Sequence, residues 1–448
     1  MASSDQRAYV YLQLPQSLEV VTAGFYELDF PQGVPSGSFV YNPAYLQRAD
    51  AVPLETYELP LAPRRTQTVK LKGIFGALRD ASPDAWGRRI IEKHTGRTDL
   101  TEIDYLLHSP QDRAGALSFG RDKAPPAPVR KFNQIIQLEA LLAATEQFMN
   151  DEAAGKPGIP EQLFELLQPG TSMGGARPKN VVEDNEGLWL AKFPDKGDKW
   201  NNARVEGAML ALAQECGLRV ARHRVETVAG KEVLLVQRFD RTLTAEGYLR
   251  HRMVSGLTAL GAEDSHGDRA KWSYLLLADE LRRRSARSNQ DLEELFRRMV
   301  FNALISNTDD HPRNHALIAT TDKWELSPAY DLTPNPLTSL DKRDLAMTCG
   351  TFNRYANRTN LLSQHGQFKL SLERATAIID DVQQTVASRW HAVLRQHGTT
   401  PAECERLATA FNYAGFELDP ALVLDSIGIN SASQTSRFRR RTSSSVVR

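Results

Sequence analysis

The stretch Asn302-Ala-Leu-Ile-Ser-Asn-Thr-Asp-Asp-His-Pro-Arg-Asn-His-Ala-Leu317 constrains the fold of this 448-residue chain more than any other. Within it the acid Asp309 is followed five residues later by an amide, Asn314. A second acid, Asp331, follows a short strand-like run, within Leu326-Ser-Pro-Ala-Tyr-Asp-Leu332. A carboxylate can accept a proton, and an amide with a further carboxylate can supply the hard oxygen ligands that Mg²⁺ prefers. The pattern therefore predicts a base and a metal site at a polar turn between a helix and strands.

Two simpler interpretations of the same stretch remain open. Residues 307–310 could merely end a helix and form a turn, and taken alone the stretch favours that interpretation. His311 and His315 are four residues apart, which is the spacing of a helical metal-binding pair. Pro312 lies between them and no glutamate follows His311, so the sequence disfavours a metal site made by the two histidines.

The composition is that of an ordinary soluble globular protein, with 41% hydrophobic and 25% charged residues. The formal net charge is zero, so no global field argues for binding to nucleic acid or to an anionic membrane. The three cysteines are widely spaced, form no metal-binding pattern and suggest a reducing compartment. No apolar run approaches the roughly 18 residues of a membrane span, and the first residues lead into a strand. We expect a cytoplasmic protein with no membrane partner.

The predicted elements run from strands to helices, which indicates an α+β protein with a ligand site between two lobes. Ser82 is placed to cap a helix with Pro83 at its first position. The chain is mostly β over 8–75, and helices are expected over about 204–216, 272–284, 291–306 and 372–396. Four parts are predicted: a β-rich module (1–125), a small lobe (126–240), a helical lobe (241–430) and a disordered tail (431–448). The tail has five arginines and no acid, and a solvated tail is favoured over a nucleic-acid contact.

A glycine-containing loop, Ser172-Met-Gly-Gly-Ala-Arg-Pro-Lys179, could approach phosphate groups closely. It has no large side chains at Gly174, Gly175 and Ala176, so its backbone N–H groups could face an anion. It matches neither of the two common phosphate-loop patterns, and by itself an ordinary Gly-Gly turn is the favoured interpretation.

A lysine, Lys192, interrupts the apolar run Leu188-Trp-Leu-Ala-Lys-Phe193, and a charge there is costly unless an anion accompanies it. Glu206, which opens the next helix, could pair with it. A lysine at a strand edge and an exposed glutamate favoured by the helix dipole are equally good explanations. Downstream, an apolar strand becomes polar at Gln237 and Phe239, whose backbone groups could bind a purine edge. A plain strand end explains that segment as well.

The order of these elements is that of the catalytic loop of protein kinases: a helix, a polar turn with an acid and an amide, a strand and a second acid. With four further segments, this order resembles the HipA family, serine/threonine kinases that serve as toxins of bacterial toxin–antitoxin pairs. The matching segments are Gly73-Ile-Phe-Gly-Ala-Leu-Arg-Asp-Ala-Ser-Pro-Asp-Ala-Trp-Gly-Arg88, Ser172–Lys179, Val236-Gln-Arg-Phe-Asp-Arg241, Asn307–His315, Leu326–Leu332 and Leu345-Ala-Met-Thr-Cys-Gly350. The resemblance spans about residues 8–425, and its Asn-Thr-Asp and Tyr-Asp-Leu elements are the specific ones.

The resemblance implies a protein-kinase-like two-lobed fold and roles for individual residues toward ATP and Mg²⁺. Asp309 would be the catalytic base, and Ser172 matches a serine that the family autophosphorylates. Lys192 would contact nucleotide phosphate, and the backbones of Gln237 and Phe239 would contact adenine. Asn314 and Asp331 would bind Mg²⁺. The loop residues Met173, Gly174, Gly175 and Ala176 would cover the phosphates, and His311 would lie beside the nucleotide. Family members often carry an acid where this chain has Gln237, which leaves backbone recognition intact.

The resemblance also implies partners. The usual one is a small helix-turn-helix antitoxin that binds operator DNA, so DNA contact would be indirect. Family substrates include aminoacyl-tRNA synthetases, whose modification leads to growth arrest or persistence. Two alternatives stay open: a small-molecule or lipid kinase with the same core, and an inactive kinase-shaped co-repressor. Intact Lys192, Asp309, Asn314 and Asp331 argue against the co-repressor, which would not need them. The tail has no counterpart in the family.

Overall fold

A five-stranded antiparallel sheet forms the N-terminal part of the chain, in a computed structural model that describes residues 6–127, 132–167, 175–336 and 339–418. Its strands are β1 (Arg7–Gln13), β2 (Val20–Asp29), β3 (Ser36–Tyr41), β4 (Thr66–Thr68) and β5 (Leu117–Gly120), in the order β4-β3-β2-β1-β5. Four short helices accompany it: α1 (Pro43–Leu46), α2 (Gly76–Asp80), α3 (Ala85–Thr95) and α4 (Glu102–His108). The predicted β-rich beginning of the chain is therefore present.

The start of α3 differs from the sequence prediction. Asp84, and not Ser82, is the N-cap, and its carboxylate accepts a hydrogen bond from the N–H of Gly87 (2.9 Å). A carboxylate at this position satisfies an unpaired amide and also interacts favourably with the positive end of the helix dipole. The Ser82 hydroxyl instead accepts a hydrogen bond from Arg88.

A second five-stranded sheet is covered on both faces by helices. Its strands are β6 (Asn133–Gln134), β7 (Lys179–Asp184), β8 (Gly187–Lys192), β9 (His223–Val228) and β10 (Lys231–Gln237), in the order β6-β7-β8-β10-β9. Alternate residues of β10 face opposite sides: Val233 and Leu235 join the cluster that includes α5 (Leu138–Ala153), while Leu234 and Val236 join the cluster that includes α7 (Asn202–Glu215). This two-residue period is the reason that one strand can bury two helices. Helix α6 (Glu161–Leu167) packs beside α5.

Short strands also occur where the sequence predicts mainly helix, from residue 241 onward. A hairpin pairs β11 (Arg241–Thr244) with β12 (Gly247–Arg250), and a three-stranded sheet follows, with β13 (Arg252–Ser255), β14 (Ala316–Ala319) and β15 (Glu325–Leu326). The sequence predicts β14 and β15 but not β13. Strand β13 pairs antiparallel with β14 across about sixty residues of sequence, and local patterning cannot reveal such a pairing.

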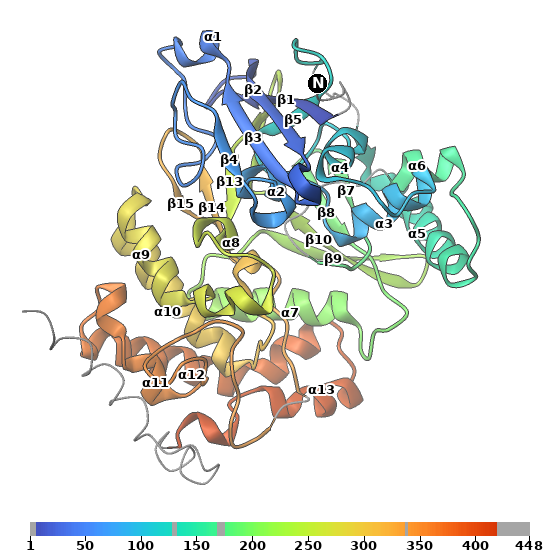
Figure 1. The fold of residues 1–448 in the computed structure, drawn as a ribbon. Coiled ribbons are helices and arrows are strands. Elements are labelled where there is room, and N and C mark those ends of the chain that lie inside the picture. Colours follow the sequence, from blue (N-terminus) through green and yellow to red (C-terminus); the bar gives the residue numbers. More distant parts are fainter. Residues whose placement is uncertain (1–5, 128–131, 168–174, 337–338, 419–448) are drawn as a thin grey trace, which may run out of the picture.

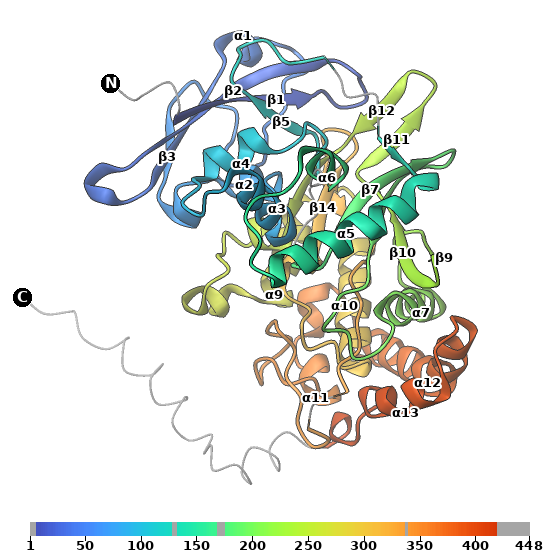
Figure 2. The ribbon, with the colours of Figure 1, turned by 90° about the vertical axis from the view of Figure 1, so that its right-hand side faces the viewer.

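Helices form the rest of the C-terminal part. They are α8 (Gly256–Ala259), α9 (Tyr274–Arg284), α10 (Ser288–Leu304), α11 (Arg358–Leu362), α12 (Leu372–Gln396) and α13 (Pro401–Leu407), and short 3₁₀ turns join them, of which η6 (Pro312–Asn314) matters most here. Figure 1 shows α11–α13 at the opposite end of the molecule from the N-terminal sheet, and Figure 2 shows the same arrangement from the side. The fold is thus the predicted α+β, kinase-like fold with a helical C-terminal lobe. Within the described residues no helix is long and apolar enough to cross a bilayer.

Candidate active site

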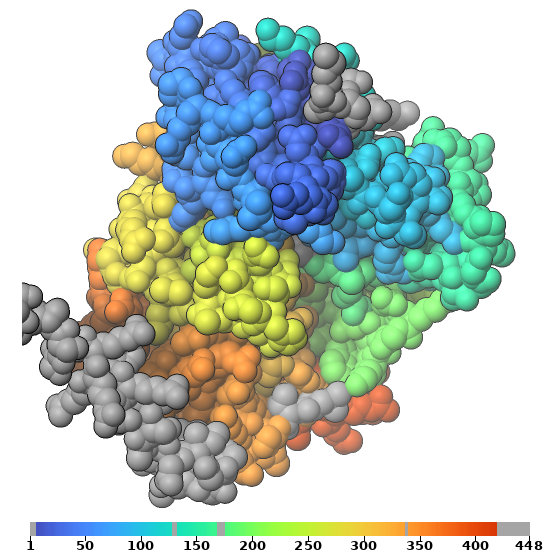
Figure 3. All heavy atoms as spheres, in the orientation of Figure 1, coloured from blue at the N-terminus to red at the C-terminus, as the bar shows by residue number. Residues whose placement is uncertain are grey.

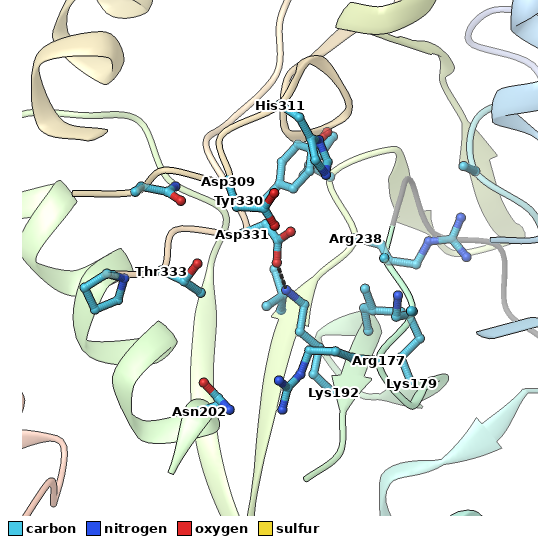
Figure 4. A pocket seen from close by; sticks show the side chains of 18 of the residues that line it. Arg177, Lys179, Lys192, Asn202, Arg238, Asp309, His311, Tyr330, Asp331 and Thr333 are labelled. Carbon is cyan, nitrogen blue, oxygen red and sulfur yellow. Dashed lines mark hydrogen bonds and ion pairs between the residues drawn. The ribbon is translucent and has the colours of Figure 1, made fainter. Parts of the chain in front are cut away.

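A cavity of about 510 Å³ lies where β7, β8 and β10 meet the turn after α10. Residues from both lobes line it (Figure 4). The lining residues used below are Gly175, Ala176, Arg177, Lys179, Lys192, Gln237, Arg238, Phe239, Asp309, His311, Tyr330 and Asp331. The structure therefore brings most of the described sequence-predicted site residues to one place, although they come from segments more than a hundred residues apart.

Lys192, the last residue of β8, is held between two carboxylates from different elements. Its Nζ lies 2.5 Å from Glu206 Oε1 on α7 and 2.8 Å from Asp331 Oδ1. Burial by itself would lower the pKa of Lys192, but the two carboxylates outweigh it and raise that pKa above its usual value. The predicted pairing of Lys192 with Glu206 is present, and it leaves the ammonium charged and fixed in direction at the cavity wall.

Asp331 has a backbone φ of +57°, in the left-handed region that residues with a Cβ atom rarely adopt. Its carboxylate points toward Lys192 in Figure 4, where a dashed line marks the ion pair. The Lys192 charge lowers the pKa of Asp331 to about 2, against the opposing effect of burial. Asp331 is therefore ionised throughout the neutral range, as a metal-binding carboxylate must be.

Asp309 and Asn314 occupy the polar turn between α10 and β14. The Asn314 side-chain Nδ2 donates a hydrogen bond to the backbone carbonyl of Asp309 (3.2 Å). The pKa of Asp309 is raised by reduced solvation and, to a smaller extent, by Asp331 and Asp310, while His311 opposes the shift. A carboxylate with a raised pKa is a better proton acceptor than an ordinary aspartate, because basicity increases with pKa.

The oxygens available in this turn suit Mg²⁺. Asn314 is buried, and its Oδ1 has no hydrogen-bond partner among the described residues. A buried amide oxygen without a partner is costly unless a ligand uses it. Asp331 would supply the second oxygen ligand. In the described part of the chain, no group of three His, Cys, Asp or Glu side chains could hold a metal. Two protein oxygens fit a Mg²⁺ ion whose remaining ligands are phosphates and water.

The two histidines of the turn have different surroundings. His311 lines the cavity, and its Nδ1 is buried with no hydrogen-bond partner among the described residues. His315 is fully buried behind the turn, where its Nε2 lies 2.9 Å from Asp310 Oδ2. The Tyr274 hydroxyl donates to the same oxygen of Asp310. His315 thus belongs to a buried polar network that supports the turn, and only His311 borders the space where a nucleotide would lie.

The segment predicted to bind adenine forms the inner wall of the cavity. The Gln237 N–H donates to the Arg222 carbonyl (2.7 Å), so it is already used within the protein. The Phe239 N–H makes no hydrogen bond to any described residue, and the Phe239 ring lies 5.6 Å from the Tyr330 ring. A free backbone donor beside two aromatic rings suits a flat heteroaromatic ligand.

Part of the predicted phosphate loop can be placed and part cannot. Ser172, Met173 and Gly174 lie outside the described residues. Gly175 and Ala176 line the cavity, and Gly175 has a φ of +103°. That φ value is the reason that glycine is favoured here, since residues with a Cβ atom rarely adopt it.

Three basic residues of the cavity were not singled out by the sequence, although all three lie inside quoted motifs. Arg177 binds both carboxylate oxygens of Asp198 (2.6 Å), while Lys179 and Arg238 are held by aspartates of the N-terminal module. Their charge was visible in the sequence, but the direction of each side chain was not, because it depends on which strand pairs with which. Because each of the three is paired with a carboxylate, they add N–H donors to the cavity wall but little net charge.

Comparisons with known proteins identify the family of the chain and agree with its fold. The family model of the HipA-like C-terminal domain matches residues 171–390, and that of the HipA N-terminal domain matches residues 28–120. Two relatives from Sinorhizobium fredii, Y4mE and Y4dM, carry names that call them kinases. They are 26% and 24% identical, over 66% of this chain and 71% of each relative. A solved structure of the Shewanella oneidensis toxin–antitoxin system, HipA with HipB and operator DNA, matches with a TM-score of 0.64 at 17% identity. It covers 90% of this chain and 94% of that chain.

The fold and site define a kinase-like protein with two lobes and an added N-terminal module. The chain belongs to the HipA kinase family, since the two family models match both its N-terminal and its C-terminal part.

Proposed function

We propose that this chain is an ATP- and Mg²⁺-dependent serine/threonine protein kinase that acts as the toxin of a bacterial toxin–antitoxin pair. The observation that carries the proposal is that Lys192, Asp309 and Asp331 line one cavity, while Asn314 lies in the same turn as Asp309 and donates a hydrogen bond to its backbone carbonyl. Each of them matches a part that phosphoryl transfer to a hydroxyl requires.

The charge of each residue suits a different part of the proposed reaction. Lys192 would bind nucleotide phosphate oxygens, with Glu206 keeping its ammonium in place. Asn314 Oδ1 and Asp331 would hold Mg²⁺, which neutralises phosphate charge when bound. Asp309 would orient the acceptor hydroxyl and take its proton as the oxygen forms a bond to the γ-phosphorus and ADP leaves. Catalysis of this kind rests on positioning and charge, and the cavity offers both.

The acceptor is proposed to be a serine or threonine of a protein concerned with translation, possible targets including an aminoacyl-tRNA synthetase, and also Ser172 of this chain. The resemblance of the Ser172–Lys179 segment to the family supports the autophosphorylation. A phosphate there would add about −1.5 to −2 charge, which would disturb a loop that covers other phosphates. The proposed partner is a HipB-like helix-turn-helix antitoxin, since the matching Shewanella structure is a complex of HipA, HipB and operator DNA.

The deciding experiment incubates purified protein with labelled ATP and Mg²⁺, alongside Asp309→Asn and Ser172→Ala. We expect autophosphorylation of the wild type that both variants lack. Label that persists in Asp309→Asn would rule out the assigned base, and label that persists in Ser172→Ala would rule out the assigned acceptor. In cells, induction should arrest growth, and Asp331→Asn should relieve the arrest. An equally toxic Asp331→Asn variant would separate toxicity from kinase chemistry.

A further inference from the structure

Asp80, at the end of α2 in the N-terminal module, is buried inside the catalytic part of the protein. Its side chain accepts hydrogen bonds from the Ser255 N–H (2.7 Å), the Ser255 hydroxyl (2.8 Å), the Thr258 hydroxyl (2.7 Å) and Arg313 Nη1 (3.2 Å). The exposed fraction of the side chain is only 2%. A carboxylate that receives four donors at this depth is fixed in position, because no water replaces a lost partner.

Arg313 links Asp80 to the turn that contains the proposed base, Asp309. It is the residue directly before Asn314, and its guanidinium also binds Asp264 (2.7 Å). Its backbone carbonyl accepts a hydrogen bond from the Tyr330 hydroxyl (2.8 Å), and Tyr330 directly precedes Asp331. A shift of Arg313 would therefore be felt on both sides of the proposed metal site.

The helix between Asp80 and the turn is packed too closely to absorb such a shift. The backbone N–H of Gly256, the first residue of α8, donates to the His315 carbonyl (2.7 Å). A Cβ atom on Gly256 would lie 2.6 Å from the Pro312 carbonyl oxygen. On the other side, a Cβ atom on Gly76 in α2 would lie 2.6 Å from Thr258. Helices α2 and α8 and the turn thus form one tightly packed stack, and close-packed interiors transmit displacement.

Two further aspartates of the module hold other walls of the cavity in the same way. Asp84 binds Lys179 at the start of β7 (2.8 Å), with side-chain exposures of 2% and 4%. Asp112 binds Arg238 (2.5 Å), the residue between Gln237 and Phe239. Figure 3 shows the module, coloured blue to cyan, lying directly on the yellow and green segments beneath it. Two segments that line the cavity, the start of β7 and the residues around Arg238, are thus each tied to the module by an aspartate.

We propose that the N-terminal module is a positioning part of the active site and that Asp80 is the positioning residue which, through Arg313, holds the turn of Asp309 and Asn314 in its productive geometry. The catalytic side of this inference rests on the proposed kinase function. The claim that Asp80 orders the turn does not rest on that function, because it concerns only the structure of the turn. Asp80 touches no reacting atom, so its removal acts through the placement of other groups.

The test compares Asp80→Asn with Gln13→Ala in the full chain. Gln13 is buried and also joins the module to the rest of the protein, through the backbones of Tyr248 and Arg250, but it does not line the cavity. We expect Asp80→Asn to lower kcat about 10- to 100-fold, with KM for ATP changed less than about threefold. Gln13→Ala should leave kcat within about twofold of wild type at a temperature where both variants are folded. A wild-type kcat in Asp80→Asn, or an equal loss in Gln13→Ala, would overturn the proposal.

Hydrogen–deuterium exchange of the peptide spanning residues 305–317 tests whether Asp80 orders the turn, and it does not require kinase activity. Exchange should be faster in Asp80→Asn than in wild type and unchanged in Gln13→Ala. Equal exchange in Asp80→Asn and wild type would overturn the proposal even if the protein is an active kinase. If the wild type transfers no phosphate, the kinase function fails on its own, while the exchange result still stands for or against the positioning role.

A double-mutant cycle identifies the route. If Asp80 acts through Arg313, Asp80→Asn should add little to the kcat loss or the exchange rate of Arg313→Met. Losses that multiply would show that Asp80 acts by another route and would contradict the assignment. If Asp80→Asn does not fold, Arg313→Met alone tests the same link from its other end. Wild-type kcat with wild-type exchange in that variant would overturn the proposal.

Discussion

Lys192 Nζ lies 2.8 Å from Asp331 Oδ1, across 139 residues of sequence. This ion pair joins the last residue of β8 to the segment after β15, and therefore joins the two sides of the cavity. Lys192 also binds Glu206, so one ammonium lies between two carboxylates. In this arrangement one carboxylate oxygen of Asp331 is paired with Lys192, so a Mg²⁺ ion at the proposed site would share that carboxylate with the lysine.

Replacing Lys192 by methionine should weaken both the nucleotide site and the fold. Glu206 is largely buried, and without the ammonium it would face Asp331 with no intervening positive charge. We expect the free energy of unfolding to fall by about 2 kcal/mol, as for other lost charged hydrogen bonds. KM for ATP should rise and kcat should fall. Thermal unfolding and steady-state kinetics measure the two effects, and Lys192→Arg, which keeps the charge, should lose less stability.

Replacing Asp309 by asparagine should remove the proton acceptor while leaving nucleotide binding largely intact. General-base catalysis typically contributes about 10²- to 10⁴-fold, so kcat should fall within that range. KM for ATP should change little, because Asp309 contacts neither the predicted phosphate site nor the adenine site. A variant with wild-type kcat would show that the proton is accepted elsewhere.

Replacing Asp331 by asparagine should increase the Mg²⁺ concentration needed for half-maximal rate. The amide keeps one oxygen but loses the negative charge that attracts a divalent cation. Titration of the initial rate with Mg²⁺ at saturating ATP measures the change. Asp381→Asn is a matched control, since the Asp381 side chain is 62% exposed on α12 and binds Arg297. An unchanged Mg²⁺ requirement in Asp331→Asn would exclude Asp331 as the metal ligand.

The rate should fall in acid at a pH above the ordinary aspartate range. Asp309 works as a base only when ionised, and its pKa is raised, so it takes up a proton at a higher pH than an ordinary aspartate. Asp331, with a pKa of about 2, stays ionised through that interval and adds no limb of its own there. The profile of kcat/KM against pH should therefore show an acidic limb with its midpoint above about 3.9. A profile that stays flat down to that pH, in protein still folded by circular dichroism, would contradict the assignment.

The buried network behind the turn should matter for stability more than a surface hydrogen bond does. Tyr274→Phe removes the hydroxyl that donates to Asp310, and Asp310 would keep His315 as its remaining side-chain partner. We expect a loss of about 1–3 kcal/mol in unfolding free energy, because Asp310 is almost completely buried. Tyr248→Phe, which removes a half-buried hydroxyl bound to Glu183, is the control and should cost less. Equal losses would show that burial of the network does not decide its contribution.

The sequence alone determined the class of the fold and predicted the site residues. Asp309, Asn314 and Asp331 stand in polar turns at fixed spacing between apolar elements. The sequence offered the pairing of Lys192 with Glu206 as one of two equally good explanations, and the structure decided for it. Element boundaries agreed within a few residues where the apolar period was long, as in α10 and α12. The cap of α3 was wrong by two residues, because Ser82 and Asp84 are both good caps and only the backbone decides between them. The roles assigned to these residues and the boundaries of the four predicted parts stay predictions, and the tail and Ser172 lie outside the described residues.

Only the tertiary structure decided which distant surfaces meet. Asp80 and Arg313 are 233 residues apart, and nothing in either local pattern predicts that one binds the other. The same holds for Asp84 with Lys179 and for the pairing of β13 with β14. Periodicity reports the face of a helix or strand on which a side chain lies, but the partner of that face depends on the packing of the whole chain. For this reason the sequence could name the reacting groups, while the part played by the N-terminal module became visible only in three dimensions.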